Sequence, residues 1–311
     1  MTEKFPIPVI QRTKKIEGRF INSIINNGGT YFLIDLAVYE DGVIDAWGPM
    51  DLNILDEKLL SEWVSMQIPE NEKINIHHLG SWEVKNATWK YDKTNYKEFI
   101  ESIIRVLNPN FKNIFIAENS TSKVIGNSNY SVFGGGQAQL IRQDGEQPNF
   151  QTINGKRQRY FYKIADGIYE IATFDIYGDE KILITTSEGV QESNLANLMN
   201  FKDLGILITD PSLGSKIIIK DLGEFELGEK RYGANVDDKL AEIKDIIAKQ
   251  NGNETTSEIC RRIFDEYNAS PSEELKQKLT TAYENVPKHL RPYLGDMDSK
   301  DWPIRNIIYK E

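Results

Sequence analysis

One stretch of the sequence occurs twice, and this repeat limits the folds that the chain can adopt. Lys73–Val84 reads KINIHHLGSWEV, and Lys216–Leu227, much further along the chain, reads KIIIKDLGEFEL. Upstream, Tyr31–Gly42 and Tyr169–Glu180 form a second similar pair with a slightly shorter spacing. Two similar blocks in the same order indicate a duplicated module. The change in spacing indicates one insertion of five residues between the blocks.

The pattern of apolar and turn residues predicts an α+β fold with two related, mostly antiparallel β modules. We expect the first module over residues 16–92, a helix and an irregular connection over 93–155, and the second module over 156–232. We expect residues 235–311 to form a helical C-terminal segment. In that segment Thr255 and Glu258 have the spacing of a capping box, Pro271 suits the first position of the next helix, and the final IIY suits a short strand.

Composition bears on the partners that the chain can take. The formal net charge is −10 and the sequence pI is near 5.1, which opposes general attraction to nucleic acid or to an anionic membrane. The charge suits a basic protein partner, and it equally suits simple solubility. No apolar run long enough to cross a membrane and no signal peptide are evident, so a cytoplasmic location is expected. The one cysteine, Cys260, leaves no intramolecular disulfide and is expected to be a small buried residue.

Two segments resemble known families. HHLGSW within Ile76–Trp82, and YLGDMDSKDWPIR over Tyr293–Arg305, resemble uncharacterised bacterial domain families. The resemblance implies a bacterial origin and carries over no activity.

His77 and His78 are the most chemically suggestive pair, because histidine titrates near neutral pH and binds metals. On an extended strand, adjacent residues point to opposite faces. Alternation with Ile74 and Ile76 therefore predicts His78 inward, His77 outward and no shared metal. The second module has Lys220 and Asp221 at these positions.

Carboxylates supply the other candidate site. Asp296, Asp298 and Asp301 lie in DMDSKD and offer oxygen ligands suited to Mg²⁺ or Ca²⁺, but the loop departs from the EF-hand pattern. A turn that caps a helix or forms ion pairs explains the same residues.

Two further motifs carry weaker signals. Gly134–Gly136 lacks the GK[ST] of a phosphate-binding loop. Arg157 and Arg159 lie beside aromatic residues, which fits either a nucleic-acid surface or an alternating strand.

These observations favour a non-enzymatic protein-binding function in the bacterial cytoplasm. An immunity-type protein or a subunit of a defence complex would fit, with no cofactor and with another protein, basic in character, as partner. The alternative is a metal-assisted hydrolase or nuclease-like enzyme that uses His77 or His78 together with Asp296, Asp298 and Asp301.

Overall fold

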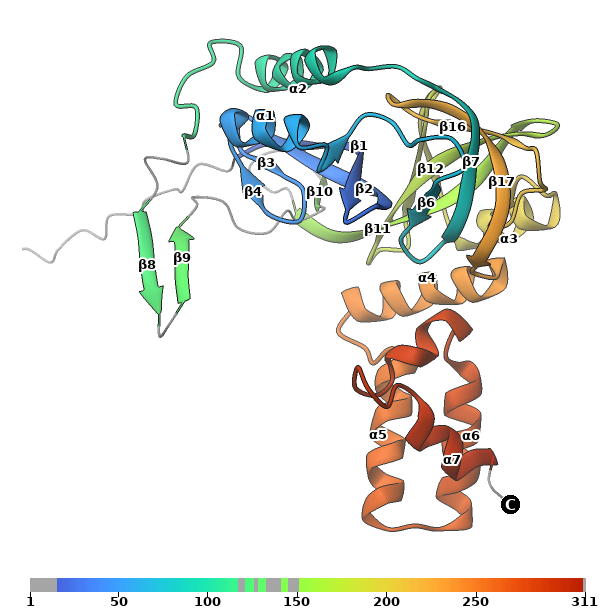
Figure 1. The fold of residues 1–311 in the computed structure, drawn as a ribbon. Helices are drawn as coiled ribbons and strands as arrows, with labels where there is room; N and C mark the ends of the chain where they lie inside the picture. The colour runs from blue at the N-terminus through green and yellow to red at the C-terminus, as the bar shows by residue number, and fades with distance from the viewer. Residues whose placement is uncertain (1–15, 117–120, 126–127, 133–140, 145–150, 310–311) are drawn as a thin grey trace, which may run out of the picture. The chain divides into compact units, whose positions relative to one another are not determined.

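The protein was analysed as a computed structural model that describes residues 16–116, 121–125, 128–132, 141–144 and 151–309. It has an α+β fold in which a large, mostly antiparallel sheet precedes a helical C-terminal domain (Figure 1). The Gly134–Gly136 segment considered above lies outside the described residues.

The same order of strands and helices occurs twice, as the repeat predicts. The first copy contains β1 (Gly18–Asn27), β2 (Thr30–Tyr39), β3 (Ile44–Asp45), β4 (Pro49–Met50), α1 (Leu52–Leu60), β5 (Val64–Ser65), β6 (Lys73–Ile76), β7 (Gly80–Trp89) and α2 (Lys93–Leu107). The second contains β11 (Gln151–Ala165), β12 (Ile168–Tyr177), β13 (Ile182–Thr186), β14 (Gly189–Ser193), α3 (Leu195–Asp203), β15 (Leu207–Ile208), β16 (Lys216–Ile219), β17 (Gly223–Gly233) and α4 (Val236–Gln250).

The boundaries of these elements locate the insertion between the copies. The spacing from the start of β2 to the start of β12 equals the spacing from β3 to β13. From α1 onwards, every element of the first copy through α2 is separated from its counterpart by one common, longer spacing. The spacing changes where the short β3–β4 pair of the first copy is replaced by the longer β13–β14 hairpin. The duplication is therefore confirmed, and the five-residue difference lies in one hairpin.

Two compact units divide the described chain. The smaller comprises the described parts of Met1–Ile21, Asp35–Ser61 and Asp92–Gly136. It contains the antiparallel pairs β2–β3 and β3–β4, the helices α1 and α2, and the hairpin of β8 (Thr121–Ile125) and β9 (Ser128–Val132). In it, the amide of Asn108 ends α2 by donating to the carbonyl oxygens of Glu40 and Lys112.

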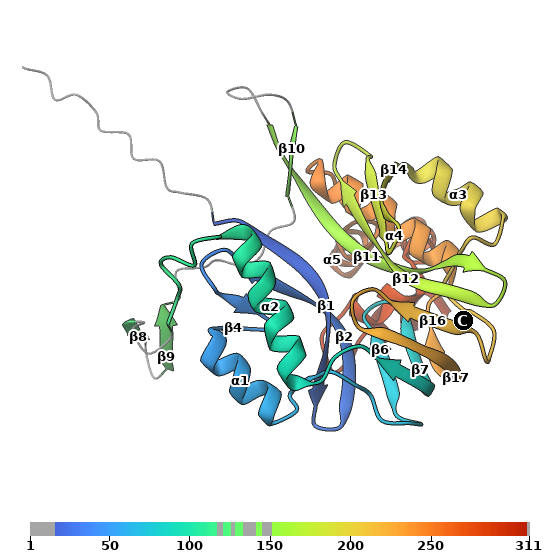
Figure 2. The same ribbon diagram turned by 90° about the horizontal axis from the view of Figure 1, so that it is seen from above.

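The larger unit comprises Asn22–Ile34, Glu62–Tyr91 and the described part of Gln137–Glu311. Its central strands follow the order β11–β12–β16–β17–β7–β6, and β10 (Ile141–Asp144) pairs with β11. Each copy has a parallel pair, β2–β6 or β12–β16, and an antiparallel hairpin, β6–β7 or β16–β17. The antiparallel pair β7–β17 joins the copies (Figure 2).

The β7–β17 pair is close to two-fold symmetric. Val84 lies opposite Leu227, its own counterpart in the repeat. On one side the N–H of Ala234 donates to the carbonyl of Leu79 at 2.8 Å, and on the other the N–H of Lys90 donates to the carbonyl of Leu222, also at 2.8 Å. Each copy therefore holds the β-turn of the other copy with the residue that follows its own long strand.

Glycine begins both of these long strands for a steric reason. Gly80 and Gly223 have φ of +155° and +147°, in the region that favours glycine. A Cβ at Gly80 would collide with the backbone of Tyr232 and Gly233, and a Cβ at Gly223 with the backbone of Thr88 and Trp89. These two glycines permit the close approach on which the joining of the copies depends.

The C-terminal domain has its own hydrophobic core. It contains α5 (Thr256–Ala269), α6 (Glu273–Asn285), the 3-10 helix η2 (Lys288–Tyr293) and α7 (Trp302–Tyr309). The buried residues of this core are Cys260, Leu279, Ala282, Tyr283, Val286, Leu294 and Ile304. Thr255 and Glu258 form the predicted capping box at the start of α5.

Three local expectations are wrong. Pro271 precedes the N-cap residue Ser272, whose hydroxyl accepts from Leu275 N–H, so it is outside the helix and not at its first position. The terminal IIY lies in α7, because Ile304 packs into the helical core and favours a helix over an unpaired strand. His77 and His78 lie in the turn after β6 and not on the strand, with His78 at φ +56°.

None of the helices in the described ranges combines the length and the apolar character that a membrane-spanning helix needs.

We expect Gly80→Ala and Gly223→Ala each to lower the free energy of unfolding by about 3 kcal/mol or more, because a methyl group would push the two copies apart. Gly29→Ala is the matched control. Its φ is also positive, at +83°, but no other atom lies within 4 Å of the added Cβ, so only the conformational cost of about 1–2 kcal/mol applies. Urea unfolding of the three variants measures the difference. Equal losses at all three positions would contradict the close-approach argument.

Cys260 should report on opening of the C-terminal domain. Burial raises the pKa of its thiol to about 11, so at pH 8 almost no reactive thiolate is present in the folded protein. We expect a thiol reagent to react slowly with the native chain and rapidly with the chain unfolded in guanidinium. Rapid labelling under native conditions, with the helical circular dichroism unchanged, would show that this core is not closed.

Candidate functional site

The three histidines of the chain gather around one buried carboxylate. Glu242 lies on α4, His78 in the β6–β7 turn and His289 in η2. The Nδ1 atom of His78 is 3.1 Å from Oε1 of Glu242, and the Nε2 atom of His289 is 2.9 Å from Oε2. The ring of His77 lies beside that of His78, with 3.8 Å between centroids. Segments far apart in the sequence therefore converge on Glu242.

A buried lysine completes this cluster. The ammonium of Lys239 donates to Oε2 of Glu242 at 2.7 Å, and the side chains are 1% and 4% exposed. Beside it, the hydroxyl of the fully buried Tyr160 donates to the backbone carbonyl of Lys239. A buried ion pair of this kind is weak evidence for stability, because desolvation of both charges offsets much of their attraction.

The environment shifts the pKa values of several of these groups. Burial opposes ionisation of Glu242, but hydrogen bonds from His289 and His78 and the charge of Lys239 outweigh it and hold its pKa far below the usual range. Burial lowers the pKa of Lys239, and Glu242 offsets this only in part. His77 is exposed, yet loss of water around its ring, followed by the effect of His78, lowers its pKa to about 4.

Local sequence explains how the helix presents these side chains. Asn235 caps α4 by accepting from Asp237 N–H, and Leu240, Ile243 and Ile246 pack the helix against strands of the second copy. Lys239 and Glu242 lie on this same buried side, where an amphipathic helix normally carries apolar residues.

The first copy carries different residues at the matching positions. When the spacing that relates β7 to β17 is extended to the helices, Lys239 corresponds to Tyr96, and Glu242 corresponds to Phe99. Tyr96 is fully buried, and its ring lies 6.1 Å from that of Phe99. The charged cluster is therefore a property of one copy and is not required by the shared fold.

A row of carboxylates on α4 holds the C-terminal domain. Asp238, Glu242 and Asp245 recur at helical spacing along one side of the helix. Asp238 accepts from the N–H of Lys288 at 3.2 Å, Glu242 faces His289, and Asp245 accepts from the N–H and hydroxyl of Thr256 at 2.8 and 2.6 Å. The attachment of this domain to α4 is polar, and Glu242 lies in the middle of it.

The cluster has chemistry beyond hydrogen bonding. One ligand atom from each of His78, Glu242 and His289 can be chosen so that all three lie within 4.8 Å of one another, and no other described group of this kind occurs. Two imidazoles and one carboxylate are a common ligand set for Zn²⁺.

The contacts of the predicted aspartates lie within the C-terminal domain. Asp296 accepts from the N–H of Asp298 and from the N–H and hydroxyl of Ser299, which closes a tight turn. Asp301 accepts from the hydroxyl of Tyr283 at 2.6 Å. These side chains shape the C-terminal domain, and whether they bind a metal stays a prediction.

The two arginines considered above are engaged inside the larger unit. Arg157 makes a two-pronged ion pair with Asp175, at 2.6 and 2.8 Å. Arg159 is buried and donates to the amide oxygen of Asn22. Tyr160 and Phe161 beside Arg159 are also buried, so these aromatic rings offer no exposed face for stacking of bases.

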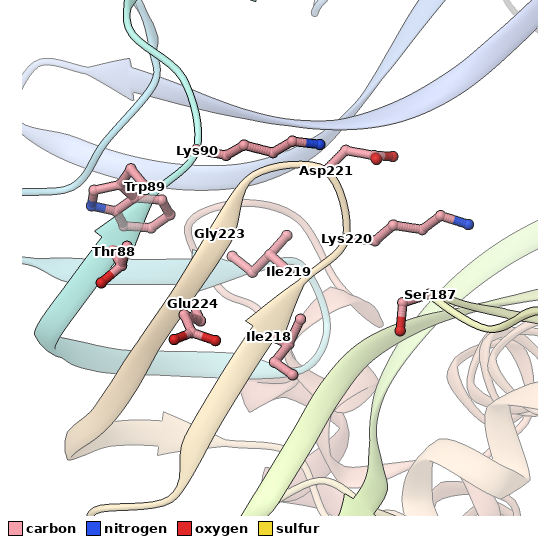
Figure 3. Close-up of a pocket in the computed structure, with 10 residues that line it drawn as sticks. All are labelled: Thr88, Trp89, Lys90, Ser187, Ile218, Ile219, Lys220, Asp221, Gly223 and Glu224. Carbon is pink, nitrogen blue, oxygen red and sulfur yellow. The ribbon is translucent and has the colours of Figure 1, made fainter.

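The counterpart of the histidine turn borders a pocket of about 480 Å³ (Figure 3). Lys220 and Asp221 replace the histidines there, and Thr88, Trp89, Lys90, Ser187, Ile218, Ile219, Gly223 and Glu224 complete the lining. Lys220 donates to the carbonyl of Thr186 and Ser187 to Glu170. These polar groups are satisfied by neighbouring residues and do not converge on one point.

Sequence reasoning missed Lys239, Glu242 and His289. The repeat contained a signal for the first two. When its spacing is extended to the helices, the charged pair of the second copy aligns with two aromatic residues of the first copy. No comparable signal existed for His289, because it lies outside the repeated part.

We expect Glu242→Ala to lower the free energy of unfolding by about 3–5 kcal/mol, because it leaves Lys239 buried without its partner. The double variant Lys239→Met with Glu242→Leu should lose less, since both buried charges are gone. Lys244→Met, at an exposed position of the same helix, should change stability by no more than about 0.5 kcal/mol. Thermal or urea unfolding compares the variants. A double variant as unstable as the single one would show that the charges themselves are not the cause.

Comparisons with known proteins agree with this domain organisation. A family model described as Domain of unknown function (DUF7638) matches residues 6–111 and again residues 145–254. A second model, Domain of unknown function (DUF7639), matches residues 255–311. No curated protein and no solved structure matches the chain. The resemblance to uncharacterised families is confirmed, and bacterial origin stays a prediction. The DUF7638 matches cover more than half of the sequence, so the chain belongs to that family and carries its region twice, followed by a DUF7639 region.

Proposed function

We propose that the chain is a non-enzymatic binding protein that takes a basic protein partner on its C-terminal domain. The observation that carries the proposal is the group of large apolar side chains exposed within residues 293–309. Tyr293, Met297, Trp302 and Tyr309 are 62%, 93%, 60% and 58% exposed. Tyrosine, tryptophan and methionine are enriched at protein interfaces, and tyrosine and tryptophan often dominate binding energy.

The loop that presents Met297 is built by specific contacts. Oδ1 of Asp296 accepts from the N–H and hydroxyl of Ser299 at 2.6 and 2.7 Å. The backbone of Lys300 approaches Gly295 so closely that no Cβ would fit there. One exposed methionine is ordinary, but four large exposed apolar side chains within residues 293–309 support a binding role.

Charge indicates the chemistry of the partner. Exposed Asp296 and Asp298 flank Met297, and the whole chain carries a formal charge of −10. A partner surface with basic side chains around an apolar pocket would complement this loop. An immunity-type protein that neutralises a basic toxin, or a subunit of a defence complex in the bacterial cytoplasm, would have this chemistry.

The enzymatic alternative has less support from the geometry. A hydrolase or nuclease-like site would need His77 or His78 beside Asp296, Asp298 or Asp301. Of these, His78 instead faces Glu242, and Asp301 is engaged with Tyr283.

We expect a partner captured from the native host to bind the wild-type chain and to lose about tenfold or more in affinity for each of Met297→Ala and Trp302→Ala. Leu213→Ala, which removes an exposed leucine from the second copy, is the matched control and should bind normally. Association should also slow as salt rises, because exposed charges are screened beyond about 10 Å at 0.1 M ionic strength. A partner that binds both variants normally, or one whose association ignores salt, would contradict the proposed surface and its charge.

A further inference from the structure

The geometry points to a zinc site that joins the two domain types. We propose that Nδ1 of His78, Nε2 of His289 and the carboxylate of Glu242 bind one Zn²⁺ ion. These residues come from the first copy, the C-terminal domain and the second copy respectively. A bound ion would therefore tie three separate parts of the chain together.

The three ligand atoms lie close to the separations that such an ion needs. Zinc binds imidazole nitrogen and carboxylate oxygen at about 2.0–2.2 Å, which in a tetrahedron puts neighbouring ligand atoms about 3.3 Å apart. The two nitrogen atoms lie 3.1 and 2.9 Å from the oxygen atoms of Glu242. These distances are to different oxygen atoms, and the three ligand atoms lie within 4.8 Å of one another. The two imidazoles would therefore move toward one oxygen to share an ion.

The site also has the burial that a bound ion needs. The Glu242, His289 and His78 side chains are 4%, 15% and 24% exposed, so the site is enclosed and keeps one partly open side, at His78. Nδ1 of His289 is buried without a hydrogen-bond partner among the described residues. The ring is thus held from one side only, and Nε2 is the atom that faces the cluster.

The ammonium charge of Lys239 disfavours binding of a metal ion at this site. Its ammonium lies 2.7 Å from Oε2 of Glu242, and two cations in one buried site repel each other. Oε1 faces His78, so this oxygen is available to the metal while Oε2 remains with Lys239, and the ring of His289, which now faces Oε2, must turn toward Oε1. The chain therefore binds zinc with an affinity that this lysine limits, and removal of its charge strengthens binding.

The test uses the full-length chain, freed of any affinity tag and treated with a chelator, titrated with zinc chloride in a calorimeter. One ion should bind per chain, and binding should raise the temperature of unfolding. His78→Ala, His289→Gln and Glu242→Gln should each weaken binding by about tenfold or more. Lys239→Met should strengthen it by about tenfold or more, because a like charge is gone.

Lys244→Met is the matched control, since it removes a lysine charge from an exposed position of the same helix, and it should bind as the wild type does. Cobalt substitution gives a second readout, because visible absorption bands report nitrogen and oxygen ligands whether or not a variant is fully stable. A wild-type chain that binds no zinc overturns the proposal. So does zinc binding that survives unchanged when both His78 and His289 are replaced.

Discussion

The antiparallel pairing of β7 with β17 is the interaction on which the rest of the larger unit depends. It joins the two copies with Val84 opposite Leu227 and requires glycine at both Gly80 and Gly223. Because each long strand leads directly into a helix, the pairing also brings the turn of the first copy next to the start of α4, where Ala234 N–H holds Leu79. The meeting of His78 with Glu242 follows from this arrangement.

Duplication also explains why the cluster occurs in one copy only. Two copies of one fold give two helices with the same cap position, Asp92 or Asn235, and the same apolar face. One helix keeps Tyr96 and Phe99 on its buried side, whereas the other carries Lys239 and Glu242. The second arrangement requires desolvation of two charges. It also provides a polar centre to which side chains from other segments can bind.

The C-terminal domain combines an independent core with a polar attachment. Its apolar side chains pack around Cys260 and Leu279, while Asp238, Glu242 and Asp245 hold it to α4 through hydrogen bonds. Polar interfaces between domains resemble those of transient complexes. The same domain carries the exposed side chains of Met297 and Trp302.

The sequence by itself determined the duplicated α+β architecture, the five-residue difference in spacing between the copies, and the capping box at Thr255, because these depend on periodicity and on contacts between near neighbours. It did not determine that His77 and His78 lie in a turn, or which groups they contact. The turn at His77 and His78 depends on a positive φ, which the alternation of Ile74 and Ile76 does not reveal. Only the tertiary structure decided that His289 and His78, both distant from Glu242 in the sequence, approach its carboxylate. Such contacts depend on how strands and helices of separate segments pack, and no local pattern of residues records that packing.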